Sequence, residues 1–135
     1  MRPGIPEALR AARAADLPMA VVSNTPCGAA HRDFLDRAGV GPLFAAQIYS
    51  DEAGVRKPNP EMIWRAARVL GVPAERCWFV GDSRRRDVVC GRRAEVAVTV
   101  LMRSPRTDRE DPAAWPVPDA EVEDGFGLRD LLPAR

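Results

Sequence analysis

Hydrophobic and polar positions alternate along the chain between two patterns, one typical of buried strands and one typical of helices. A continuous apolar run lies at 19–22, and further short, mostly apolar runs lie at 45–49, 77–80 and 96–102, with a weaker candidate edge strand at 120–122. Continuous apolar runs fit strands covered on both faces of a sheet. Between them, apolar residues recur at helical spacing over about 5–15, 28–38, 60–70, 85–94 and 127–132. This alternation predicts right-handed βαβ units and an α/β fold with a doubly wound, mostly parallel Rossmann-like sheet.

The chain is predicted to form one domain over residues 1–135. This length buries roughly two thirds of the unfolded surface, and we find no internal repeat. Residues 104–118 contain four prolines and mixed charges, and we expect an irregular surface loop there. Trp64 and Trp78 stand within predicted elements and are expected in the core.

Composition excludes several classes of protein. The content of 46% hydrophobic and 29% charged residues fits a globular domain, and a net charge of +1 argues against nucleic acid as a partner. No apolar run approaches the ~18 residues that span a membrane, and the first residues lack the apolar segment of a signal peptide. Three cysteines without CxxC spacing argue against a disulfide framework, so we expect a cytoplasmic protein.

Polar residues follow two of the predicted strands. Ser23 and Asn24 come directly after 19–22, and Asp82 follows 77–80 with a second acid, Asp87, five residues later; Lys57, the only lysine, lies between them in sequence. Ligands of open α/β sheets bind outside the carboxyl ends of the strands. We therefore predict a phosphate site at one sheet edge, with the polar atoms of Ser23, Lys57 and Asp82 within about 8 Å of a common point.

Each of these residues also has a simpler explanation when it is taken alone. Ser23 is an ordinary strand-end residue, Lys57 a solvated loop lysine, and Asp82 the start of a turn. Asp87 is a possible partner for the arginines at 84–86. Their order along the chain favours the shared site.

The ordered set Val21-Val22-Ser23-Asn24-Thr25, Arg56-Lys57-Pro58 and Gly81-Asp82-Ser83 with Asp87 resembles motifs two, three and four of the haloacid dehalogenase-like (HAD) hydrolases. The resemblance runs from about Pro3 to Leu132. It implies a HAD-like core and, most simply, a Mg²⁺-dependent phosphatase that acts on a small phosphorylated metabolite, a phosphate monoester. In this family a carboxylate attacks phosphorus and forms an aspartyl-phosphate, which water then hydrolyses.

The resemblance also implies roles for individual residues. The Ser23 hydroxyl and the Asn24 backbone N–H bind phosphoryl oxygens, and Lys57 neutralises their charge. Asp82 binds Mg²⁺ or positions its water, and Asp87 supports that site from one helical turn further on. Ser23, Lys57 and Asp82 are thus the candidate catalytic residues.

The chain departs from the family in its first motif, an Asp-x-Asp at the end of the first, central strand, which has no counterpart here. A cap domain is also missing. We therefore expect a truncated member of the family that is inactive alone. If the chain is active, Asp51 is the first candidate for the acid that replaces the missing nucleophile. The strands at 19–22 and 77–80 are expected either to pair directly or to accept another chain, by homo-oligomerisation or through a missing N-terminal segment that completes the sheet.

Two alternatives to a phosphatase remain open. One is a non-catalytic module derived from the same fold, which holds a phosphate or a protein partner through Ser23, Asn24 and Lys57. The other is dehalogenase chemistry within the same superfamily, although the Gly81-Asp82 pair favours phosphate.

Overall fold

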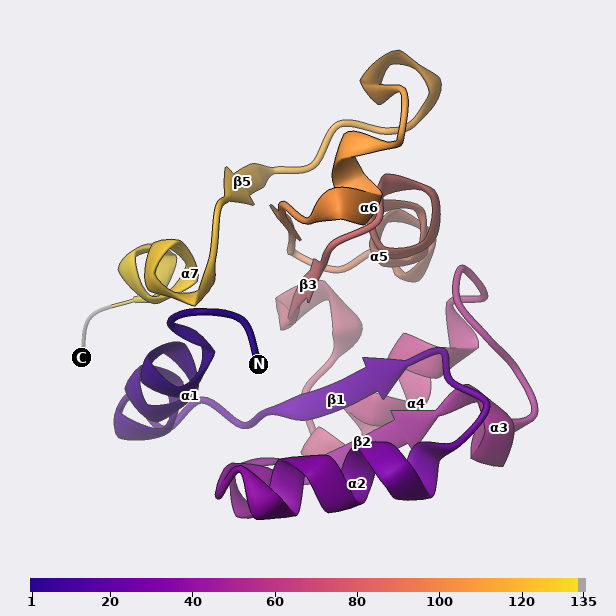
Figure 1. The fold of residues 1–135 in the computed structure, drawn as a ribbon. Coiled ribbons are helices and arrows are strands. Elements are labelled where there is room, and N and C mark those ends of the chain that lie inside the picture. The colour runs from indigo at the N-terminus through magenta and orange to yellow at the C-terminus, as the bar shows by residue number, and fades with distance from the viewer. Residues whose placement is uncertain (134–135) are drawn as a thin grey trace.

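The computed structural model describes residues 1–133, and its strands form two parallel sheets (Figure 1). One sheet pairs β1 (Ala20–Ser23) with β2 (Ala46–Tyr49), and the other has the order β3 (Trp78–Gly81), β4 (Val98–Met102) and β5 (Ala120–Val122). Every strand pair within the described residues is parallel. The predicted α/β fold with parallel strands is confirmed.

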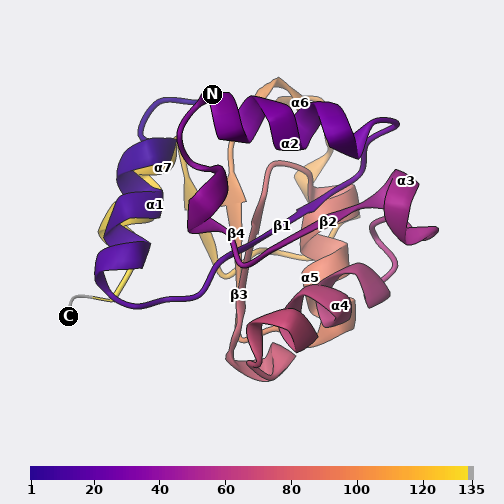
Figure 2. The same ribbon diagram turned by 90° about the horizontal axis from the view of Figure 1, so that it is seen from below.

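The helices lie close to their predicted positions. The longer ones are α1 (Ile5–Ala14), α2 (Gly28–Arg37), α4 (Glu61–Leu70), α5 (Val89–Ala94) and α7 (Gly125–Leu131), and the short ones are α3 (Ser50–Ala53) and α6 (Pro105–Asp108). α2 and α4 cover opposite faces of the β1–β2 pair (Figure 2). α1 packs beside α7 in both views (Figures 1 and 2), which joins the two ends of the chain.

β1 and β3 do not pair with each other, so the expectation of direct pairing is wrong. Each strand has its parallel partner on the other side, β2 for β1 and β4 for β3. The helical layer connects the two sheets, because α4 packs on β1 and β2 and also against α5, which packs on β4. The alternative expectation, that another segment or chain lies between β1 and β3, stays a prediction.

Burial differs between the strands in a way that agrees with this arrangement. Residues 99–102 of β4 are buried, whereas every residue of β1 is only half-buried and β3 has no buried residue. The best-buried clusters lie beneath α4 and α5, around Cys90, and along β4 and β5, around Val100. Strands at the centre of a doubly wound sheet are normally covered on all sides. β1 and β3 are therefore less completely covered than β4.

The helix expected over 85–94 begins as a π-helix, η3 (Arg84–Val88), before continuing as α5. The N–H of Val88 donates to the carbonyl oxygen of Ser83, five residues back, at 3.2 Å. Single π-turns occur frequently at functional sites. This one begins two residues after Asp82, directly behind the predicted site.

The segment 104–118 is more ordered than the irregular loop we expected. It contains α6 and a 3₁₀ turn at Pro112–Ala114, and it buries the side chain of Thr107. A capping box formed by Ser104 and Thr107, with proline in the first turn, starts α6. No helix within residues 1–133 is long and apolar enough to cross a membrane.

Candidate active site

The carboxyl ends of β1 and β3 meet the loop before α4 at one small polar pocket of about 50 Å³. Ser23 ends β1, Asp82 follows β3, and Lys57 comes from the intervening loop. The pocket is lined by Ser23, Asn24, Lys57, Asp82, Ser83, Arg86, Asp87 and Arg106. The structure thus brings all five residues singled out in the sequence to one place. Their chemical roles remain predictions.

Asp87 holds two parts of the pocket together. Its Oδ1 accepts a hydrogen bond from Lys57 Nζ at 2.7 Å, and its Oδ2 accepts from the backbone N–H groups of Asp82 and Ser83 at 3.0 and 3.1 Å. The side chains of Lys57 and Asp87 are 12% and 8% exposed. Charge-assisted hydrogen bonds are stronger than neutral ones, so Asp87 fixes both the ammonium and the turn. The arginines at 84–86 are not its partners.

Asn24 positions Lys57 from the other side. Its side-chain Nδ2 donates to the carbonyl oxygen of Lys57 at 3.0 Å, and its Oδ1 accepts from the N–H of Lys57 at 2.8 Å. The amide therefore clamps the backbone of the lysine loop. The sequence suggested only the backbone N–H of Asn24 as a phosphate ligand, and the structure adds this second use of the residue.

The turn after β3 is braced by a segment that the sequence did not point to. The Thr107 hydroxyl donates to the carbonyl oxygen of Asp82 at 2.5 Å. The Glu110 carboxylate accepts from the Ser83 hydroxyl at 2.9 Å and from the N–H groups of Arg84 and Arg85 at 2.6 and 3.0 Å. Together these bonds fix the peptide groups around Asp82. The capping box that starts α6 is the one sequence signal that this segment is ordered.

Two polar groups of the pocket stay available. The Ser23 hydroxyl has no hydrogen-bond partner within residues 1–133, and the Asp82 carboxylate, 30% exposed, has only Arg106 Nη1 at 3.8 Å. The Ser23 hydroxyl can therefore donate a hydrogen bond to an anion, and the Asp82 carboxylate can bind a cation. The hydroxyl of Ser23, the fixed ammonium of Lys57 and the weakly held carboxylate of Asp82 together suit a bound phosphoryl group with its counter-ion.

These residues do not by themselves make a Mg²⁺ site. Mg²⁺ prefers about six oxygen ligands in octahedral geometry. Both Asp87 oxygens are engaged as acceptors, which leaves the Asp82 carboxylate. No group of three or more His, Cys, Asp or Glu side chains suited to a metal occurs in the part of the chain that the structure describes. The expected Mg²⁺ needs ligands from outside this set.

Other candidate nucleophiles are not available at the pocket. Both carboxylate oxygens of Asp51 accept from the N–H of Gly28, at 3.2 and 3.1 Å, so this acid caps α2 and does not line the pocket. Cys90 lies buried behind Lys57, and its Sγ donates to the carbonyl oxygen of Asn59 at 3.6 Å. Burial raises the pKa of the Cys90 thiol to about 12, which keeps it protonated and unreactive.

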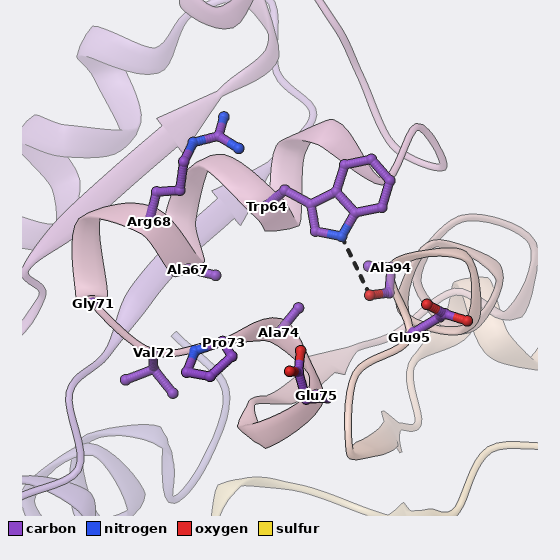
Figure 3. A pocket seen from close by; sticks show the side chains of 10 residues that line it. All are labelled: Trp64, Ala67, Arg68, Gly71, Val72, Pro73, Ala74, Glu75, Ala94 and Glu95. Carbon is purple, nitrogen blue, oxygen red and sulfur yellow. Dashed lines mark hydrogen bonds between the residues drawn. The ribbon is translucent and has the colours of Figure 1, made fainter.

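A larger hollow of about 620 Å³ lies elsewhere, between α4, the segment that follows it and the carboxyl end of α5 (Figure 3). Trp64 stands at its rim, 39% exposed, with its Nε1 donating to the carbonyl oxygen of Ala94 at 3.3 Å. Trp78 is 38% exposed. The expectation that both indoles are core residues is wrong. The hollow shares no lining residue with the polar pocket and does not contribute to it.

Comparison with known proteins finds a family model and several relatives that this chain resembles. The model of the family described as "haloacid dehalogenase-like hydrolase" matches residues 1–95. A glyceraldehyde 3-phosphate phosphatase of Methanopyrus kandleri is 35% identical over 98 residues, which are 73% of this chain and 42% of that protein. A phosphoglycolate phosphatase of Pseudomonas savastanoi pv. phaseolicola is 32% identical over 131 residues, 97% of this chain and 46% of that protein.

Solved structures show the same fold. A HAD phosphatase from Thermococcus onnurineus superposes with a TM-score of 0.80 at 23% identity, covering 96% of this chain and 56% of that one. A predicted phosphoglycolate phosphatase from Haemophilus somnus gives 0.80 at 25% identity over 96% and 54%. The chain spans about half the length of the curated relatives it matches. The resemblance seen in the sequence is confirmed, and the chain belongs to the haloacid dehalogenase-like hydrolases.

Proposed function

We propose that this chain forms the phosphate-binding part of a phosphatase that hydrolyses small phosphate monoesters. The observation that carries the proposal is the pocket in which Ser23, Lys57 and Asp82 meet, with Asp87 holding both the lysine and the turn. Relatives named as phosphatases of small phosphorylated compounds support it.

In this proposal each side chain acts on the phosphoryl group through charge or hydrogen bonding. The Ser23 hydroxyl and the Asn24 backbone N–H donate to non-bridging oxygens. Lys57, kept in place by Asp87 and the Asn24 amide, offsets the negative charge that spreads over the phosphoryl oxygens in the transition state. Because Lys57 is fixed before the substrate binds, the ammonium needs little reorganisation during the reaction.

The nucleophilic carboxylate is proposed to come from a strand placed between β1 and β3. Both strands pair on one side only and are incompletely buried, and the pocket lies where they end. A parallel strand there would place its carboxyl-terminal residues at the pocket. Its acids would also supply the ligands that Asp82 lacks for Mg²⁺. The strand belongs either to an upstream segment of the polypeptide or to another chain.

A second candidate function follows from the acids that the pocket contains. Of its two carboxylates, Asp87 is fully engaged and Asp82 lies near Arg106. A chain that works without a further segment would therefore bind phosphate without hydrolysing it. This non-catalytic module uses the same three contacts, Ser23, Asn24 and Lys57.

Phosphate binding tests what both functions share. We expect a Ser23→Ala variant to bind ethyl phosphate at least about tenfold more weakly than the wild type in titration calorimetry, because one hydrogen bond to a charged group contributes about 1.5–3 kcal/mol. Ser50→Ala is the matched control, since Ser50 Oγ accepts from the N–H of Thr25 at 2.9 Å outside the pocket. Equal affinities of the two variants would contradict the assigned site.

A further inference from the structure

Two arginines line the pocket in addition to the residues that hold the phosphoryl group. Arg86 belongs to the π-helix η3, and Arg106 belongs to α6, twenty residues later in the chain. The braced segment around Thr107 and Glu110 brings α6 to this position. Within residues 1–133, neither arginine side chain hydrogen-bonds to Lys57 or to the turn after β3.

The partners of these arginines leave their guanidinium groups largely uncommitted. Arg86 has no side-chain partner within residues 1–133, and its backbone N–H donates to the Ser83 hydroxyl at 3.1 Å. Arg106 lies 3.8 Å from Asp82, beyond hydrogen-bond distance, and its side chain is 63% exposed. Both groups can therefore turn towards a bound anion without breaking a strong contact.

The charged groups that line the pocket leave it with a net positive charge before a substrate binds. Lys57 and Asp87 form a buried pair at 2.7 Å and offset each other. Asp82 then remains as one negative charge beside two arginines. Guanidinium groups bind carboxylates and phosphates through paired hydrogen bonds, which makes arginine better suited than lysine to planar anions.

We propose that Arg86 and Arg106 form a subsite for a second anionic group on the substrate. The substrate class is then a small phosphate monoester that also carries a carboxylate or a second phosphate. This inference rests on the proposed function, because it takes the phosphoryl group to be held by Ser23 and Lys57. It adds a specificity determinant within the core domain itself.

The test compares three probes by titration calorimetry on the whole chain: ethyl phosphate, phosphoglycolate and a propanediol bisphosphate. We expect at least one of the two doubly functionalised probes to bind about tenfold more tightly than ethyl phosphate, the gain of one charged hydrogen-bonded contact. In the double variant Arg86→Gln/Arg106→Gln that gain should fall to about twofold or less. A gain for phosphoglycolate alone identifies a carboxylate, and a gain for the bisphosphate alone identifies a phosphate.

The control is Arg85→Gln, which removes the same charge from the neighbouring exposed residue that does not line the pocket. It should keep the tenfold gain. The proposal of a second-anion subsite is overturned if the affinity gain over ethyl phosphate persists in the double variant. It is also overturned if neither doubly functionalised probe binds the wild type more tightly than ethyl phosphate. If that happens while Ser23→Ala still weakens ethyl phosphate binding, the proposed function stands. No measurable binding of all three probes contradicts both.

Discussion

The buried pair of Lys57 and Asp87 offers the sharpest test of how the site is built. Replacing Asp87 by alanine removes the acceptor for the Lys57 ammonium and for the two N–H groups of Asp82 and Ser83. The ammonium then stays in a position where its side chain is 12% exposed. Breaking a buried ion pair from one side costs about 3–5 kcal/mol. That is a large part of the roughly 5–15 kcal/mol that stabilises a domain.

Urea unfolding followed by circular dichroism at about pH 7 measures this loss as a shift of the midpoint at constant slope. The matched control is Asp33→Ala, which removes an exposed ion pair with Arg37, where the side chains are 55% and 80% exposed. The free energy of unfolding of this control should fall by less than about 0.5 kcal/mol. The double variant Lys57→Met/Asp87→Ala should recover part of the loss, because the uncompensated buried charge is gone.

Two results would refute this reasoning. One is a loss below about 1 kcal/mol for Asp87→Ala, which would mean that the pair is solvated. The other is a double variant that is no more stable than Asp87→Ala, which would mean that the ammonium was never left uncompensated.

Three further predictions concern single contacts. The exposed thiol of Cys27 should react readily with a disulfide reagent in the folded chain. Burial raises the pKa of the Cys90 thiol to about 12, so Cys90 should react only after urea unfolding. Equal labelling of both cysteines in the folded chain would contradict the buried position of Cys90. Hydrogen bonds from Thr99, chiefly from its backbone N–H, hold the pKa of Asp119 below its ordinary value of 3.8, so this acid contributes stability above that pH and loses it as the pH falls further. Asp119→Asn should therefore be less stable than the wild type at about pH 7 and lose less stability on acidification to about pH 3, as urea midpoints would show. Asn24→Ala should weaken ethyl phosphate binding several-fold by freeing the Lys57 loop, and unchanged affinity in calorimetry would show that the clamp is dispensable.

The sequence was sufficient to predict the fold class and where the pocket residues gather. Each strand that delivers a polar residue is a short apolar run, and parallel strands place their carboxyl ends at one edge. That argument needs only the order of Ser23, Lys57 and Asp82 along the chain. It does not need to know which helix packs on which strand.

The contacts that hold the pocket together were not predictable in the same way. Thr107 and Glu110 reach the turn after β3 from about 25 residues away, and no local pattern encodes such a contact. Asp87 pairs with Lys57 and not with the neighbouring arginines because the turn directs its carboxylate inward. Tertiary packing decided these details.

The sequence also did not determine which strands pair. Direct contact of β1 with β3 was a reasonable expectation from the cost of leaving backbone groups unpaired, about 1–3 kcal/mol each. In the structure the two strands lie in separate sheets, and α4 contacts both β1 and α5. The exposure of Trp64 similarly reflects the hollow beside α4, which the apolar pattern alone did not reveal.

The central claim is that this chain binds the phosphoryl group but lacks the carboxylate that attacks it. The most direct test measures hydrolysis of a generic phosphomonoester with Mg²⁺ by the purified chain and by its Asp82→Asn variant. We expect the same negligible rate from both, and activity that Asp82→Asn abolishes once a segment carrying the missing strand is supplied. A robust Mg²⁺-dependent turnover by the 135-residue chain alone, lost in Asp82→Asn, would contradict the account.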